Sequence, residues 1–273
     1  PDPDHAGGGN ILVYSPILRH WRIFHFCLLP FALSGALAKT KRGEGRGEGE
    51  SFMQRIIIFA NGELPDLEQA RAILRDDDYI LCADGGARHA LALDLIPNLV
   101  IGDMDSIDSA EWKRLEVKNI PIEFFPRDKN ETDLELAINK AIEICEASPL
   151  GEHPNEIIIV AALGGRMDHT LANISLLAAL RLSTFNLRLD DGIEQLLFCR
   201  AQAEIRGRSG DIVSLIPWGN PVHGVRTENL KWQLKEETLF PEKTRGISNE
   251  MTNNIARVKI SSGLLLIVHT RKS

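Results

Sequence analysis

Short, continuously apolar runs alternate with segments of helical period through the middle of the chain. The runs are Ile56–Phe59, Tyr79–Cys82, Leu99–Ile101, Ile122–Phe125 and Ile157–Val160. A strand that is apolar on both sides of its pleat is covered on both faces, as in a parallel sheet between two layers of helices. The pattern therefore predicts an open, mostly parallel α/β sheet.

The clearest helical segment begins at Asp133 and ends near Ala147. Its apolar residues recur at i, i+3 and i+4 and so form a single stripe: Leu134, Ala137, Ile138, Ala141, Ile142 and Cys145. Thr132 and Glu135 have the spacing of a capping box at its start. We expect this helix to bury its stripe against the sheet.

The character of the chain changes after a further helix, which we expect from about Asp168 to Leu182. The later apolar runs are Gln195–Phe198, Ile212–Ile216, Ala256–Ile260 and Leu264–Val268, separated by Gly, Pro and Asn. No long helical period accompanies them, which favours a second, all-β domain, a sandwich. We therefore expect an α/β domain over residues 53–183 and a β-sandwich over residues 184–273.

Residues 1–52 differ from the rest of the chain. An apolar run over Ile23–Ala38 is followed by the low-complexity stretch Lys39–Glu50. The run has the outline of a secretory signal, but no initiator Met precedes it, and it is shorter than the about 20 residues that cross a membrane. We favour an upstream extension over a functioning signal, and we expect the folded body to begin at Met53.

The formal net charge of -7 argues against broad binding to nucleic acids, because such affinity comes from cations that meet phosphates. An acidic protein that handles polyphosphate needs a divalent metal between its own carboxylates and the substrate oxygens.

The four cysteines are scattered, without a CxxC pair: Cys27, Cys82, Cys145 and Cys199. We interpret them as reduced core thiols, and we expect a cytoplasmic protein with no membrane partner.

Acidic residues follow the predicted strands. The acids are Asp84, Asp103, Asp105, Asp133 and Asp168. Residues two apart in an extended segment face the same side, so Asp103 and Asp105 are expected to point at one ion. All five acids are expected at the carboxyl edge of the sheet, where ligands of such folds bind. Clustered carboxylates repel one another unless a cation compensates, and this indicates Mg²⁺.

Each of these motifs also has an ordinary structural interpretation. Thr132, Asp133 and Asp168 suit helix caps, and Asp-Gly sequences are common in turns. The combination of three acidic, Gly-rich junctions favours a metal and phosphate site. Gly164-Gly-Arg166 adds backbone N–H groups and a guanidinium suited to phosphate oxygens. Neither a P-loop nor GxGxxG occurs in the chain.

Five motifs together resemble the thiamine pyrophosphokinase family, in its order and spacing, from Met53 to the end of the chain. They are Asp84-Gly-Gly-Ala-Arg88, Gly102-Asp-Met-Asp-Ser106, Thr132-Asp-Leu-Glu-Leu-Ala137, Leu163-Gly-Gly-Arg-Met-Asp-His169 and Gly246-Ile-Ser-Asn-Glu250. The resemblance implies an α/β nucleotide-binding domain followed by a β-sandwich, in a homodimer with shared active sites. It also implies transfer of the diphosphate of ATP to the hydroxyl of thiamine, with AMP as the second product.

The resemblance also implies roles for single residues. Asp84, Asp103, Asp105 and Asp133 resemble the acids that hold Mg²⁺ and orient the reacting groups. The residues implied at ATP are Thr132, Arg166, Asp168, Lys129 and Asn130. Ser248 and Asn249 resemble thiamine contacts, and Trp232 is a candidate for stacking on a thiamine ring or, alternatively, an aromatic at the rim of the sandwich.

One position departs from the family pattern. The family usually carries an acid two residues before Thr132, where this chain has Asn130. The expected consequences are one charge fewer at the site and a closer approach of Lys129 to the phosphates.

The rival hypotheses for the function are a diphosphokinase that acts on a hydroxymethylpterin and a noncatalytic nucleotide or thiamine sensor. The β-rich second half argues against the first rival, and the complete set of acids against the second.

Overall fold

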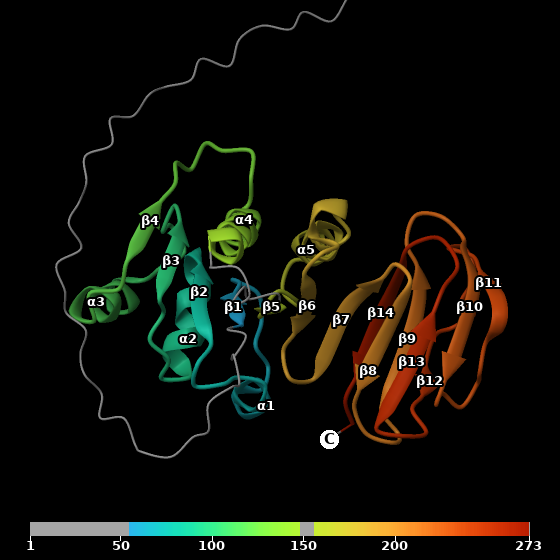
Figure 1. Ribbon diagram of the computed structural model, residues 1–273. Helices are drawn as coiled ribbons and strands as arrows, with labels where there is room; N and C mark the ends of the chain where they lie inside the picture. Colours follow the sequence, from blue (N-terminus) through green and yellow to red (C-terminus); the bar gives the residue numbers. More distant parts are fainter. Residues whose placement is uncertain (1–54, 148–155, 273) are drawn as a thin grey trace, which may run out of the picture. The chain divides into compact units, whose positions relative to one another are not determined.

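The computed structural model describes residues 55–147 and 156–272 (Figure 1). The predicted extension over residues 1–52 lies outside the described residues, as does Cys27. A ten-stranded sheet has the order β12-β9-β14-β7-β6-β5-β1-β2-β3-β4, and a four-stranded sheet has the order β11-β10-β13-β8.

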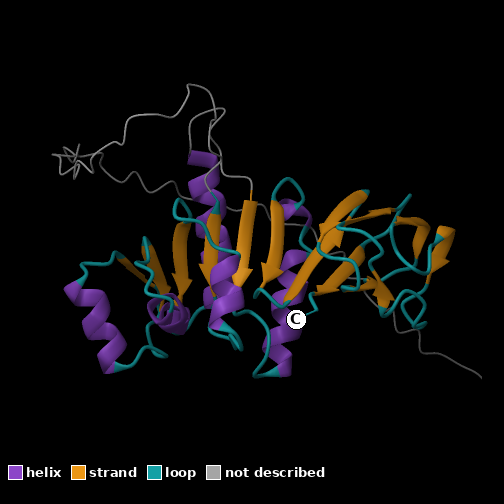
Figure 2. Cartoon of the chain, turned by 90° about the horizontal axis from the view of Figure 1, so that it is seen from below, coloured by secondary structure: helices purple, strands orange, loops and turns teal. Residues whose placement is uncertain are grey.

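Six neighbouring strands of the large sheet run parallel and carry their arrowheads at one edge (Figure 2). They are β1 (Ile56–Phe59), β2 (Tyr79–Ala83), β3 (Leu99–Gly102), β4 (Ile122–Phe124), β5 (Glu156–Val160) and β6 (Asn186–Asp190). The five predicted parallel strands are thus confirmed. Strand β6 escaped prediction because Arg188 and Asp190 interrupt its apolar character.

Helices lie on both faces of these strands (Figure 1). They are α1 (Leu67–Ala72), α2 (Ala87–Ala92), α3 (Ser109–Val117), α4 (Asp133–Ala147) and α5 (Met167–Leu177), with short 3₁₀ turns η1 (Asp84–Gly86) and η2 (Leu180–Leu182). Helix α4 has the predicted bounds. Helix α5 ends five residues before the predicted Leu182, because the chain turns at Ala178 and η2 follows. Among the described residues, no helix is long and apolar enough to cross a membrane.

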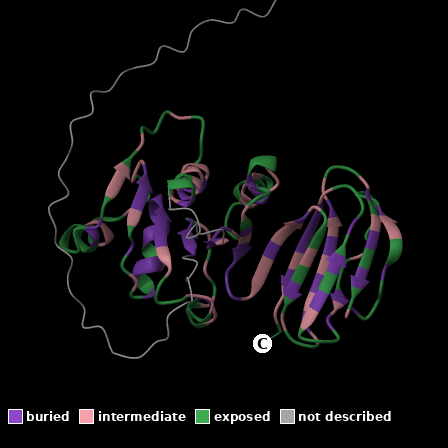
Figure 3. Ribbon diagram, viewed as in Figure 1, coloured by how far each residue is buried: buried purple, intermediate pink, exposed green. Residues whose placement is uncertain are grey.

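The central strands are apolar throughout because both faces are buried (Figure 3). Ile56 and Ile58 pack in one cluster with the apolar stripe of α4, whereas Ile57 and Phe59 pack on the opposite face with residues of α2 and α3. All four side chains are fully buried. Burial stabilises the fold by about 1.5–3 kcal/mol for each such side chain.

The second half is an antiparallel sandwich. Its strands are β7 (Glu194–Cys199), β8 (Gln202–Arg206), β9 (Ile212–Pro217), β10 (Val222–Glu228), β11 (Lys235–Leu239), β12 (Asn249–Glu250), β13 (Ile255–Lys259) and β14 (Leu265–Thr270). Residues such as Leu215, Val225 and Val258 fill the core between the two sheets. The predicted sandwich is confirmed.

The large sheet passes from the α/β half into the sandwich without a break. Strand β6 pairs with β5 in parallel and with β7 in antiparallel register. The predicted boundary at residues 183 and 184 falls just before β6, so the strand that joins the two halves belongs to both. The exact division of the chain into two domains stays a prediction.

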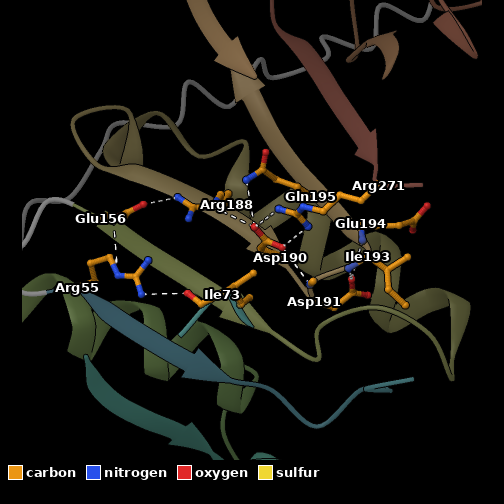
Figure 4. A network of polar contacts seen from close by, with 11 residues as sticks. Arg55, Ile73, Glu156, Arg188, Asp190, Asp191, Ile193, Glu194, Gln195 and Arg271 are labelled. Carbon is orange, nitrogen blue, oxygen red and sulfur yellow. Dashed lines mark hydrogen bonds and ion pairs between the residues drawn. The ribbon is translucent and has the colours of Figure 1, made fainter. Parts of the chain in front are cut away.

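A chain of charged side chains, centred on the buried Asp190, crosses this junction (Figure 4). Arg188 lies between Glu156 and Asp190, with nitrogen–oxygen distances of 2.5 and 3.5 Å. Asp190 also accepts hydrogen bonds of 2.8 and 2.9 Å from the guanidinium of Arg271, just after β14. The side chain of Asp190 is only 1% exposed, so its charge depends on these partners. The contacts fasten the last strand of the sandwich to the α/β sheet.

The described cysteines match the expectation of core thiols. Cys82, Cys145 and Cys199 are buried. Burial raises the pKa of Cys145 and that of Cys199 to about 11. These thiols are therefore protonated at neutral pH, which suits a structural role.

Candidate active site

A cavity of about 740 Å³ opens at the carboxyl ends of the parallel strands. It is lined by residues that follow β1, β2, β3 and β5, among them Asn61, Asp84, Asp103 and Gly164. Strands β2, β3 and β4 are added to the sheet on one side of β1. The chain then crosses back, and β5 and β6 are added on the other side of β1. The cavity therefore lies at the switch point of the topology, where open α/β sheets bind their ligands.

Glycines allow the backbone segments next to the carboxyl end of β1 to approach one another closely. A Cβ atom on Gly86 would lie 2.0 Å from the carbonyl oxygen of Phe59, and one on Gly62 would lie 2.5 Å from that of Ala161. Any side chain at either position would force the strand ends apart. The Asp84-Gly-Gly sequence is thus required by packing as well as by the site.

Three carboxylates converge in the cavity. Ligand atoms of Asp84, Asp103 and Asp105 all lie within 4.8 Å of one another. Asp84 is 3% exposed and has a left-handed backbone, with φ of 46°. Its Oδ1 atom is buried and has no hydrogen-bond partner among the described residues. A buried carboxylate oxygen without a donor is costly, and a cation in the cavity would satisfy it.

The prediction that an extended segment brings Asp103 and Asp105 together is wrong. The segment is not extended, because Met104 has a φ of 64°. The backbone N–H of Asp105 donates to Oδ1 of Asp103 at 3.1 Å, which makes a local turn of the type that Asp side chains form. This turn brings the two carboxylates together.

Two cations from the loop between β4 and α4 also reach the acids. Arg127 forms an ion pair with Asp105. The Lys129 Nζ lies 2.8 Å from Asp133 Oδ1 and 3.7 Å from Asp103 Oδ2. The side chain of Lys129 is 10% exposed, so its ammonium is inserted among the acids, whereas that of Arg127 is 80% exposed.

The pKa values reflect these contacts. The Ser106 hydroxyl and the charge of Arg127 hold the pKa of Asp105 below its usual value. Burial raises the pKa of Asp133, and the charges of Asp84 and Asp103 add to this, although Lys129 opposes it. Burial disfavours the Lys129 ammonium, but Asp133 and Asp103 outweigh it and raise the pKa of Lys129. Lys129 is therefore fully charged at neutral pH.

The acids fit a hard divalent cation. Three carboxylates within ligand distance of one another, one of them with an unpartnered buried oxygen, supply the oxygen donors that such ions prefer. Asp133 lines the same cavity but is paired with Lys129.

Four of the five predicted acids line the cavity, and Asp168 does not. Asp168 is 65% exposed and accepts hydrogen bonds of 3.1 and 2.6 Å from Arg166. Arg166 itself lines the cavity. Asp168 lies in the first turn of α5, after β5, but its carboxylate turns back to the guanidinium two residues earlier and does not join the other four acids.

Three neighbouring positions before α4 differ in placement. Thr132 lines the cavity, and its hydroxyl accepts the backbone N–H of Glu135 at 3.2 Å, as a helix cap does. Lys129 lines the cavity, but Asn130 is exposed and is not among its described lining residues. The position where the family usually has an acid thus lies outside the cavity in this chain.

Several lining residues were missed by sequence reasoning. They include Asn61, Glu63, Arg88, Ser106, Arg127 and His169. The Arg88 guanidinium donates to the carbonyl of Gly62 at 2.9 Å, which anchors the loop after β1. Asn61 and Glu63 follow a parallel strand, so their position was the available signal, whereas Arg88, Ser106 and His169 stand inside the motifs quoted above.

The candidate thiamine residues lie in the sandwich and do not line this cavity. Trp232 is 52% exposed, with the Lys231 Nζ 5.1 Å from its ring centre. Asn249 is buried, and its side chain accepts the backbone N–H of Trp232 at 3.0 Å and donates to its carbonyl at 2.7 Å. Asn249 therefore positions Trp232, and Ser248 is exposed beside it with a φ of 56°.

The fold and the cavity define an α/β protein equipped to hold a phosphate ester together with a divalent cation. A family model described as the catalytic domain of thiamin pyrophosphokinase matches residues 70–189. A second model, described as the vitamin B1 binding domain of thiamin pyrophosphokinase, matches residues 202–265.

Relatives and solved structures agree with these matches. Thiamine pyrophosphokinase of Bacillus subtilis is 28% identical over 80% of this chain and 99% of its own length. Thiamine pyrophosphokinase 2 of Arabidopsis thaliana is 30% identical over 71% of this chain and 78% of its own length. The crystal structure of the Bacillus subtilis enzyme superposes with a TM-score of 0.71 at 24% identity, over 81% of this chain and 100% of that chain. The chain belongs to the thiamine pyrophosphokinase family.

Proposed function

We propose that the chain is a Mg²⁺-dependent thiamine pyrophosphokinase, which transfers the diphosphate of ATP to the hydroxyl of thiamine and releases AMP. The observation that carries the proposal is the group of Asp84, Asp103 and Asp105 with its unpartnered buried oxygen, in the switch-point cavity of a member of this family. A cytoplasmic location is part of the proposal.

Asp84, Asp103 and Asp105 would hold the metal. When bound, Mg²⁺ neutralises charge on the phosphate oxygens and favours attack at phosphorus. The Arg166 guanidinium is suited to grip phosphate oxygens in a bidentate manner once it leaves Asp168. Thr132 lies at the start of α4, where the positive end of the helix also favours phosphate.

The residues of the chain also handle the thiamine hydroxyl. One carboxylate that does not bind the metal, Asp105 or Asp133, accepts a hydrogen bond from it and receives its proton as the oxygen attacks the β-phosphorus. AMP departs with the electrons of the broken oxygen–phosphorus bond. Such transfer depends on positioning and on charge neutralisation more than on covalent participation of the protein.

We also propose that the sites are shared between two subunits of a homodimer. Ser248, Asn249 and Trp232 do not line the acidic cavity. Asn249 holds the backbone of Trp232, whose exposed indole offers a flat face to a thiamine ring, and the sandwich of the second subunit would bring it to the cavity.

Product analysis tests the function and separates it from its rivals. The protein is incubated with ATP and Mg²⁺, with thiamine, with a hydroxymethylpterin, or with neither. We expect AMP to appear in equal amount to thiamine diphosphate, and only with thiamine. AMP formation with the pterin alone would support the related diphosphokinase, and binding of thiamine without AMP would support a sensor.

A further inference from the structure

The loop between β4 and α4 places positive charges on three acids of the cavity. Arg127 pairs with Asp105, and Lys129 lies between Asp103 and Asp133. Asp84 is the most buried of the four acids, and its Oδ1 atom has no hydrogen-bond partner among the described residues. Two residues of one short loop therefore balance two of the four negative charges of these aspartates.

The placement of Lys129 is specific. The side chain of Lys129 is 10% exposed, and two carboxylates face its ammonium, which offsets the cost of removing a charge from water. The side chain of Arg127 is 80% exposed, so few packing contacts restrict its position. The two cations thus differ in how firmly they are held.

These positive charges conflict with a metal. A divalent cation on Asp103 and Asp105 would share its ligands with Lys129 and Arg127, and like charges at such distances repel. The conflict disappears when the metal brings phosphate, because the phosphate oxygens offer new partners to both side chains.

We infer that Arg127 and Lys129 are resident counter-ions of the acid cluster, which the metal–nucleotide complex displaces and which then bind the phosphate oxygens of that nucleotide. The inference rests on the proposed function for the identity of the ligand. It makes the metal alone a weak ligand and the metal with nucleotide a strong one. Arg127 and Lys129 are thereby positioning residues that couple the two binding events.

Binding of Mn²⁺, followed by electron paramagnetic resonance without nucleotide, tests the first half of the inference. We expect Lys129→Met to bind Mn²⁺ alone about tenfold more tightly than the unsubstituted chain, because a like charge a few ångströms away is removed. Arg127→Gln should change the affinity in the same direction, by less. The matched control is Lys140→Met, since Lys140 pairs with Glu123 and Glu143 and does not line the cavity.

Calorimetry with a nonhydrolysable ATP analogue and saturating Mn²⁺ tests the second half. Both variants should bind the analogue about tenfold more weakly, as expected when one charged phosphate contact is lost. Unchanged or weaker Mn²⁺ binding by both Lys129→Met and Arg127→Gln would overturn the inference. If Lys129→Met fails to fold, the exposed Arg127 carries the test.

The same experiments separate this inference from the proposed function. Tighter Mn²⁺ binding in the variants, with no thiamine diphosphate made by the unsubstituted chain, would contradict the function and leave the counter-ions in place. Normal thiamine diphosphate formation, with Mn²⁺ affinity unchanged in both variants, would contradict only the counter-ions.

Discussion

Asp84 combines three unfavourable features in one residue: a left-handed backbone, a buried side chain and a carboxylate oxygen without a partner. Left-handed strain of this kind costs about 1–3 kcal/mol and is found mainly where function requires it. A residue selected for stability alone would not have this combination. The cost in free energy is explained if the carboxylate of Asp84 binds a cation.

Asp84→Asn should therefore stabilise the metal-free protein while abolishing activity. Asn tolerates the left-handed region and keeps the shape of the side chain, but removes a charge that repels Asp103 and lacks a donor. We expect a higher midpoint of thermal unfolding in EDTA and a loss of turnover of at least about a hundredfold. A lower midpoint would show that Asp84 stabilises the fold without metal.

Asp105→Asn should lower turnover by at least about a hundredfold and leave the fold intact, since one preorganised charge at the transition state contributes about 3 kcal/mol. Turnover is measured at saturating Mg²⁺, with circular dichroism to monitor folding. The control is Asp128→Asn, because Asp128 is exposed in the same region and does not line the cavity. Equal turnover in the two variants would exclude Asp105 from the site.

Among the secondary-structure elements, the helices and strands that could be predicted are those whose residues share one pattern of burial. Strands β1, β2, β3 and β5 are buried on both faces, so their apolarity is continuous, and α4 has one buried stripe. Strand β8 has only two apolar residues among its five, and β12 has two residues in all, so neither forms an apolar run of the kind that marks the other strands.

The cavity was predictable only in part, for a related reason. Asp84, Asp103 and Asp133 follow strands that the pattern locates, and topology brings strand ends together. Lys129 and Arg127 come from a loop whose path no periodicity specifies. The Asp103–Asp105 turn likewise depends on the left-handed Met104, which no sequence rule indicated.

The charged contacts between β6 and β14 should contribute measurably to stability. Arg271→Ala leaves Asp190 buried with fewer donors, and we expect a loss of about 2–3 kcal/mol in the free energy of unfolding by urea. Arg257→Ala serves as the control, since its side chain is 46% exposed and its pairs with Glu204 and Glu228 lie on the surface. That change should cost less than about 1 kcal/mol. Equal losses would mean that the Asp190 contacts add nothing to the junction.

At the scale of the whole molecule, the separation of the cavity from Trp232 and Ser248 can be tested by mixing subunits. Asp105→Asn and Trp232→Ala/Ser248→Ala chains, each nearly inactive alone, should regain activity after exchange, because one site of a mixed dimer collects both lesions and the other collects none. With half the dimers mixed, about one quarter of all sites would be intact. No recovery despite proven exchange would mean that each site is built within one chain.

The central claim is that a diphosphate moves as a unit to thiamine, and isotope transfer tests it most directly. The chain is given thiamine, Mg²⁺ and ATP labelled with ³²P at either the β or the γ position. We expect both labels in thiamine diphosphate and no label in AMP. Label from the γ position alone in a thiamine monophosphate, with ADP as the second product, would contradict it.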